Sequence, residues 1–90
     1  MEHEITVTQW HIDHGVKGLC AYCPVALALH DAGLFGTVQD TWLTIGGKNY
    51  ASPIEVESFV FDFDHSFPVE PFTFKLDLNA PQRFTTLSLI

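Results

Sequence analysis

The hydrophobic pattern has a helical period over residues 24–32 and a period of two residues after position 40. Residues 4–8 alternate and carry β-branched side chains, which predicts a short strand. Thr8 then stands where a helix N-cap is expected. Residues 9–14 predict one or two helical turns that end at Gly15, and residues 15–19 predict a loop.

The main helix is predicted to start at Pro24, because proline is favoured at the first helical position, where its missing N–H would have no partner. Cys23 is then the N-cap, and Gly33 supplies a stop after residue 32. The apolar positions of this segment form one stripe, with small residues that allow close packing on a sheet. They are Val25, Ala28, Leu29 and Ala32, with Leu27 widening the stripe.

A hairpin is predicted next, from residues 41–45 and 48–50 joined by two glycines. Pro53 interrupts the pattern. Residues 54–64 then place Phe59, Phe61 and Phe63 at alternate positions, which predicts a strand. Ile54 and Val56 would point to the opposite face from the phenylalanines, so this strand is expected to contain a bulge or a bend near Glu57.

Residues 72–78 alternate most regularly, and residues 84–90 predict an edge strand or a tail that docks on a partner. Strands outnumber helices, and the connections after residue 40 are short. The expected fold is therefore α+β in one domain spanning residues 1–90. It has an antiparallel sheet of about four to five strands, one main helix packed on one face, and a short N-terminal helix.

The chain is acidic, with 11 Asp and Glu against 4 Lys and Arg and a formal charge of −7. Its basic residues are scattered, which argues against direct binding to nucleic acid or to an anionic membrane. A basic protein surface or a cation is a better partner, although the charge would also be explained by solubility alone. No Lys or Arg lies between residues 51 and 70. The predicted partner-binding patch there is Glu55, Glu57, Asp62, Asp64 and Glu70.

No segment approaches the roughly 20 apolar residues of a membrane span, and the N-terminus lacks the features of a signal peptide. The expected location is therefore the cytoplasm. In a reducing compartment, a pair of cysteines more often binds metal or takes part in redox chemistry than forms a structural disulfide.

Four potential metal ligands cluster near the N-terminus as His-x2-His-x5-Cys-x2-Cys, namely His11, His14, Cys20 and Cys23. Zinc in structural sites takes four such ligands, often as two close pairs. Two other interpretations remain: the cysteines are small buried residues beside solvent-facing histidines, or Cys23 is a redox thiol made more acidic by the helix N-terminus. No other cofactor is indicated, and a monomer and a homodimer are both compatible with the sequence.

Other candidate sites are weaker. Asp62, Asp64 and His65 lie close together in the sequence, but acids on the wet face of a strand usually serve solubility. The Gly46-Gly47-Lys48 segment lacks the spacing of a phosphate loop and predicts a turn. Trp10, Tyr22 and Trp42 are candidates for an aromatic binding surface, but aromatic residues in a small domain usually belong to the core, which is what we expect of them. No nucleophile, base and orienting group come together in the sequence, so an enzyme is not expected.

Three segments of the chain form a recognisable set: Val7-Thr8-Gln9 with His11-Ile12-Asp13, the Cys20-x2-Cys23-Pro24-Val25-Ala26-Leu27-Ala28 block, and Pro71-Phe72-x-Phe74-x-Leu76-Asp77-Leu78. Together they resemble segments of small proteins encoded by tailed phages and prophages. The resemblance implies an accessory protein in the host cytoplasm that occupies a host protein, including defence nucleases. It implies no activity and no site residues, and His14 is not part of its pattern.

The sequence therefore predicts a non-enzymatic interaction protein that binds a basic host surface through its acidic patch. The alternative is a zinc-stabilised or thiol-dependent module that uses the histidine and cysteine cluster. A small-molecule binder is a third interpretation, which requires an apolar pocket between helix and sheet.

Overall fold

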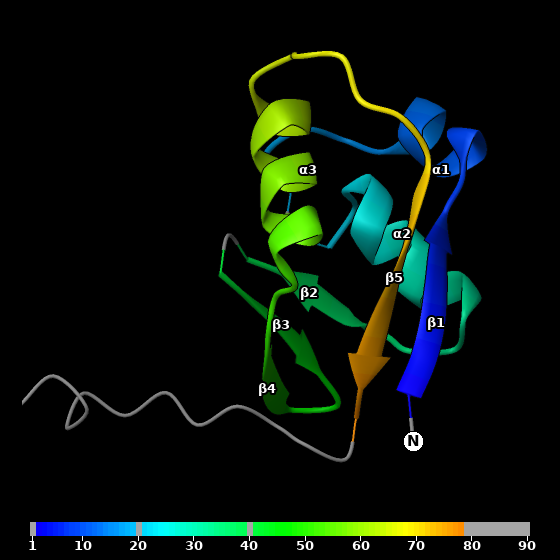
Figure 1. Ribbon diagram of the computed structural model, residues 1–90, viewed down its shortest axis with the longest axis vertical. Coiled ribbons are helices and arrows are strands. Elements are labelled where there is room, and N and C mark those ends of the chain that lie inside the picture. Colours follow the sequence, from blue (N-terminus) through cyan, green and yellow to red (C-terminus); the bar gives the residue numbers. More distant parts are fainter. Residues whose placement is uncertain (1, 20, 40, 79–90) are drawn as a thin grey trace, which may run out of the picture.

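The computed structural model describes residues 2–19, 21–39 and 41–78, which form a small α+β fold. Two antiparallel sheets and three helices surround one core, as Figure 1 shows. None of the helices in these ranges has the length and apolarity needed to cross a membrane. The elements follow the order β1 (Glu2–Val7), α1 (Gln9–His14), α2 (Pro24–Asp31), β2 (Gly36–Val38), β3 (Trp42–Ile45), β4 (Lys48–Ala51), α3 (Ile54–Asp64) and β5 (Phe72–Asp77).

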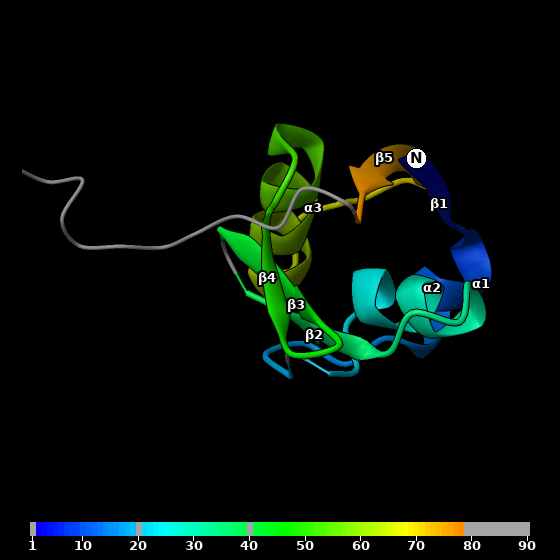
Figure 2. The same ribbon diagram turned by 90° about the horizontal axis from the view of Figure 1, so that it is seen from below.

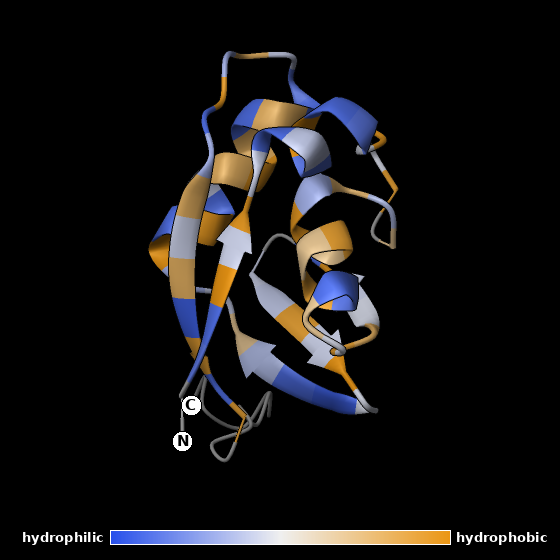
Figure 3. Ribbon diagram, turned by 90° about the vertical axis from the view of Figure 1, so that its right-hand side faces the viewer, coloured by the Kyte–Doolittle hydropathy of each residue, from blue (hydrophilic) through white to orange (hydrophobic). Residues whose placement is uncertain are grey.

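The first and last strands of the described chain pair with each other, which closes the fold over α2. In this two-stranded sheet, Ile5 lies opposite Phe74, and Glu4 lies opposite Lys75 on the outer face. The strands alternate between hydrophobic and hydrophilic residues along their length (Figure 3). This alternation is the one predicted for residues 72–78, and its apolar positions Phe74 and Leu76 are buried.

The second sheet has three strands in the order β2, β3, β4. Its predicted hairpin is confirmed, and the two turn glycines have φ angles of 59° and 80°. Such positive values at both central residues are typical of a tight hairpin turn. The short strand β2 was not predicted, and it brings Gly36 so close to β3 that a Cβ atom there would lie 1.9 Å from the Thr44 carbonyl oxygen. Only glycine fits at this position.

Both N-terminal helices begin where the sequence predicts. Helix α1 has Thr8 as its N-cap, and α2 has Cys23 as its N-cap with Pro24 at the first position. Helix α2 packs against α1, β1 and β2, and it lies next to α1 on the side of the molecule away from α3 (Figure 2). Its buried positions include Ala26 and Ala28, whose small side chains permit this close packing.

The prediction of a strand over residues 54–64 is wrong, because these residues form the 11-residue helix α3. Val56, Phe59, Val60 and Phe63 are spaced as i, i+3, i+4 and i+7, and all four are buried. Phe61, which the alternating pattern placed on the same face as Phe59, is exposed instead. Glu55 and Glu57 lie in the first turn, where the helix dipole favours negative charge.

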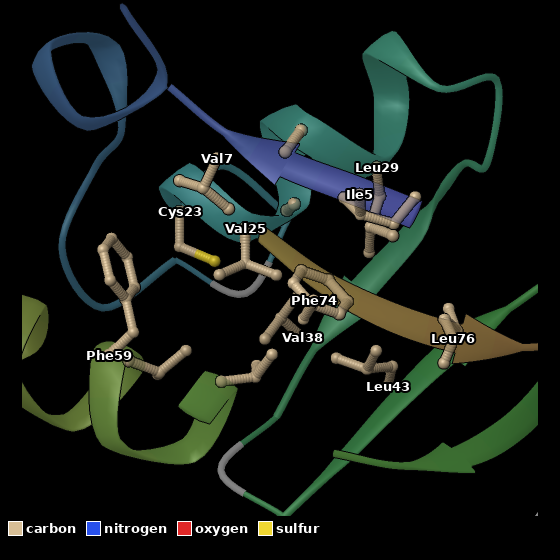
Figure 4. Close-up of a cluster of buried hydrophobic side chains, with 14 of the residues drawn as sticks. Ile5, Val7, Cys23, Val25, Leu29, Val38, Leu43, Phe59, Phe74 and Leu76 are labelled. Atoms are coloured by element: carbon tan, nitrogen blue, oxygen red, sulfur yellow. The ribbon is translucent and has the colours of Figure 1, made fainter. Parts of the chain in front are cut away.

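The single sheet of four to five strands is also corrected, since the five observed strands divide between two sheets. Two helices pack on the core rather than one, and α3 occupies the place expected for a strand. Figure 4 shows side chains from β1, α2, β2, β3, α3 and β5 meeting in one cluster. Residues 84–90, predicted as an edge strand or tail, lie outside the described residues.

Candidate functional site

The outward face of α3 combines exposed apolar side chains with acids on both flanks. Ile54 is 73% exposed and Phe61 is 55% exposed. Ile54, Ser58 and Phe61 are spaced as i, i+4 and i+7, so they follow one line along the helix. Large apolar side chains that are exposed together are typical of a surface that binds a partner.

The acids of the predicted patch lie on two sides of this line. Residues seven positions apart differ by only about 20° around a helix. Glu55 and Asp62 therefore share one flank, and Glu57 and Asp64 share the other. Glu70 lies in the loop between α3 and β5, which passes beside the first flank. The sequence identified these residues by their charge, but their division between two flanks follows from the helix.

Two hollows lie on either side of Ser58 and Asp62, and both residues line each of them. The first, the outer hollow, has a volume of about 450 Å³ and is also lined by Ile54, Phe61, Glu57 and Thr41. The second, the loop hollow, has a volume of about 510 Å³ and lies between α3 and the loop that precedes β5. It is lined by three acids, Glu55, Asp62 and Glu70, and by five apolar residues, Phe59, Pro68, Val69, Pro71 and Phe72.

Asp64 differs from the other acids because its carboxylate is used within the protein. It accepts a hydrogen bond of 3.2 Å from the Gly18 backbone N–H. Lys17 donates a hydrogen bond of 2.6 Å to the Ser66 hydroxyl, so two bonds hold the loop after α1 against the end of α3. Asp62 and Asp64 point to different flanks, and the structure does not bring them together with His65 as a cation site.

Each of two helices ends in an aromatic ring stacked on a histidine four residues later, which the sequence analysis missed. Phe61 and His65 have ring centroids 4.1 Å apart, and Trp10 and His14 have centroids 4.0 Å apart. In both pairs the histidine Nδ1 lies 2.8 Å from the carbonyl oxygen of the aromatic residue. Because a carbonyl oxygen only accepts, Nδ1 carries the proton in both histidines.

His11 does not face His14, and both of its ring nitrogens are used in hydrogen bonds. The side chain is buried. The Thr8 backbone N–H donates to Nδ1 over 2.9 Å, and Nε2 donates to an Asp31 carboxylate oxygen at 2.6 Å. The Thr8 hydroxyl accepts from the His11 backbone N–H, which completes a capping box.

The line from the Thr8 hydroxyl through His11 to Asp31 resembles the hydroxyl, imidazole and carboxylate set of some hydrolases. The Thr8 hydroxyl oxygen lies 3.1 Å from Nδ1. However, that nitrogen already accepts from a backbone N–H, so it has no lone pair left to take the hydroxyl proton. The set joins α1 to α2 and has no catalytic geometry.

The predicted zinc ligands do not fit a metal site in the described part of the chain. His11 could bind a metal only by breaking one of its two ring hydrogen bonds. His14 is exposed, and its ring stacks on the Trp10 ring. Cys23 is buried in the core beside Val7 and Val25 (Figure 4), and Cys20 lies outside the described residues. Within the described ranges, no group of three or more histidines, cysteines and acids could hold a metal ion.

Treatment with a chelator is therefore expected to leave the melting temperature unchanged, because no described ligand set depends on a metal. The measurement is native mass spectrometry with a thermal melt, before and after chelation, on protein purified without added metal. A zinc mass that disappears together with a lowered melting temperature would contradict this expectation.

Two other expectations concern the remaining aromatic residues and the helix–sheet space. Trp10 and Tyr22 are more than half exposed and Trp42 is 37% exposed, so the expectation that these three residues belong to the core is wrong. Between α3 and β2, Cys23, Val38, Val60 and other residues line a cavity of about 90 Å³. Cavities that bind small molecules usually measure about 300–1,000 Å³, so this one is too small for that role.

Comparison with known proteins adds no assignment to this geometry. No protein-family model, curated protein sequence or solved structure is significantly similar to the chain. The outward face of α3, with its two hollows, is therefore the candidate site on physical grounds.

Proposed function

We propose that this chain is a small, non-enzymatic accessory protein that binds a basic surface of another protein through the outward face of α3. The observation that carries the proposal is the mixture on this face, where exposed Ile54 and Phe61 lie between two acidic flanks. Protein interfaces commonly have an apolar, aromatic centre and a polar rim. The same arrangement exists here on one helix.

The charge of this region defines the partner. Residues 51–70 carry five acids and no Lys or Arg, so the field over the face is negative. A negative face attracts a basic partner during diffusion and repels other acidic surfaces. A symmetric homodimer through this face is disfavoured for the same reason, because it would place like charges opposite each other. A basic groove that normally binds nucleic acid has the complementary chemistry.

The phage-type context is part of the proposal and rests on the resemblance of the Cys20–Ala28 block and its companion segments. A small acidic protein of this kind would act in the host cytoplasm by occupying a host protein, including a defence protein. The lack of catalytic geometry at Thr8, His11 and Asp31 supports a binding role, since that set has a structural explanation.

Reversal of the charge at Asp62 is expected to weaken partner binding by about tenfold or more, because close charge pairs at interfaces contribute upwards of about 1.5 kcal/mol. Asp62 lines both hollows, so a lysine there opposes a basic partner in each. The partner is first captured by a photo-crosslinker placed at Ser58 and then purified. Its dissociation constant for the free protein is measured by calorimetry at two salt concentrations.

Asp13→Lys is the matched control, because Asp13 is an exposed acid bonded to Gln9 on α1, and this helix lies on a different side of the molecule from α3 (Figure 2). Circular dichroism confirms that both variants remain folded. The proposed function is wrong if Asp62→Lys binds the purified partner with the affinity and salt dependence of the parent protein.

A further inference from the structure

The loop hollow has an aromatic wall that is held in place by the core. The Phe72 ring lies 4.9 Å from the Phe59 ring and 5.8 Å from the Phe74 ring, measured between centroids. Phe72 is only partly buried, and it lines the hollow together with Phe59. Two prolines, Pro68 and Pro71, line the loop side, and their fixed φ angles restrict the loop. The wall is therefore formed before a ligand arrives.

The three carboxylates of the loop hollow come from two separate segments. Glu55 and Asp62 extend from one flank of α3, and Glu70 extends from the loop opposite. An aromatic wall with acids on two sides is complementary to a cation that has a flat face and several donors. From this geometry we propose that the loop hollow binds an arginine side chain of the partner, an inference that rests on the proposed function.

Arginine fits this hollow better than lysine for two physical reasons. Its guanidinium group is planar and weakly hydrated, so it can stack on the Phe72 ring. It also has five N–H donors, which can reach carboxylates on both sides of the hollow, whereas a lysine ammonium acts as a single point charge. The methylene groups of the arginine would cover the apolar lining near Val69.

The outer hollow indicates what kind of partner side chain would lie next to this arginine. It shares Ser58 and Asp62 with the loop hollow, so a segment that crosses α3 at Ser58 reaches both. Ser58 has a small side chain, which allows a close crossing. Ile54 and Phe61 supply an exposed apolar surface in the outer hollow. The partner segment therefore carries an arginine on one side of the crossing and an apolar side chain on the other.

The test uses three capped synthetic nonapeptides that are identical except at one central position, which holds arginine, lysine or citrulline, with a leucine three residues away. Citrulline retains the shape of arginine without its charge. Each peptide is titrated into the ¹⁵N-labelled full chain, and amide chemical shifts are recorded by NMR. The arginine peptide should shift amides within residues 54–72 and bind about tenfold more tightly than the citrulline peptide and about threefold more tightly than the lysine peptide.

Two variants and two matched controls locate the site. Glu70→Gln and Phe72→Leu should each weaken the arginine peptide by about threefold or more, since each removes one part of the proposed contact. Asp13→Asn removes one acid on α1, and Phe35→Leu replaces an exposed aromatic ring away from α3; both should bind as the parent protein does.

Equal binding of the citrulline or lysine peptide, or shifts centred outside residues 54–72, would overturn the arginine assignment. That result is independent of the Asp62→Lys experiment. If Asp62→Lys no longer binds the purified partner but the peptides show no preference for arginine, the proposed function stands and only the arginine site is wrong. If the peptides show the arginine preference but Asp62→Lys binds the partner as the parent protein does, the hollow binds arginine and the proposed function is wrong.

Discussion

Replacement of Phe74 by alanine is expected to destabilise the protein by about 3–5 kcal/mol, the usual cost of truncating a buried phenylalanine. Phe74 is 1% exposed and is among the largest fully buried side chains. It lies on β5 opposite Ile5 and contacts the Phe72 ring, so its loss opens a cavity where the two-stranded sheet meets the core. A 90-residue domain has a total stability of roughly 5–13 kcal/mol, so the variant would be close to unfolding.

Urea unfolding followed by circular dichroism measures this loss. Phe35→Ala is the control, because Phe35 is among the most exposed of the large apolar residues and makes a ring contact with His30. It is expected to cost less than about 1 kcal/mol. If Phe74→Ala cost no more than Phe35→Ala, the packing described for β5 would be wrong.

His11→Ala is expected to cost about 2–4 kcal/mol, which combines a lost helix cap with lost buried hydrogen bonds. The imidazole is 5% exposed and joins the start of α1 to the end of α2. Its removal leaves the Thr8 N–H without its acceptor. The Asp31 side chain is 67% exposed, so its carboxylate can return to water, and most of the loss arises at Thr8 and in the cavity.

His11→Gln separates these contributions. Glutamine at the third helical position can restore the bond to the Thr8 N–H, as in a common capping box, but it is not expected to span to Asp31. It should therefore recover part of the stability that alanine loses, as measured by urea unfolding. Equal destabilisation by glutamine and alanine would show that the cap contributes nothing and that the bond to Asp31 dominates.

The sequence predicted the elements whose signals are local. The cap at Thr8, the start at Pro24 and the glycine pair at Gly46-Gly47 each act within a few residues, and all three have the predicted roles. Strand β5 was also predicted, because its alternation is regular over six residues. Strand β2 was missed, since three residues are too few to show a period and its formation depends on pairing with β3.

Helix α3 was missed because its apolar residues satisfy two periods at once. Phe59, Phe61 and Phe63 alternate as in a strand, while Val56, Phe59 and Phe63 also suit one face of a helix. The two patterns differ chiefly in the place of Phe61. Packing decided between them, since a helix buries Val56, Phe59, Val60 and Phe63 in the core and leaves Phe61 outside.

The acidic region of the candidate site can be recognised without the fold, because charge is a property of composition. Residues 51–70 carry five acids and no Lys or Arg, whatever conformation they adopt. The different roles of two of these acids depend on the fold: Asp62 lines both hollows, whereas Asp64 accepts a hydrogen bond from Gly18. The fold also pairs the His11 ring with the Asp31 carboxylate, 20 residues later, and does not group it with the other predicted metal ligands that the structure describes. Such contacts join distant segments, and they form only when burial of the shared core brings those segments together.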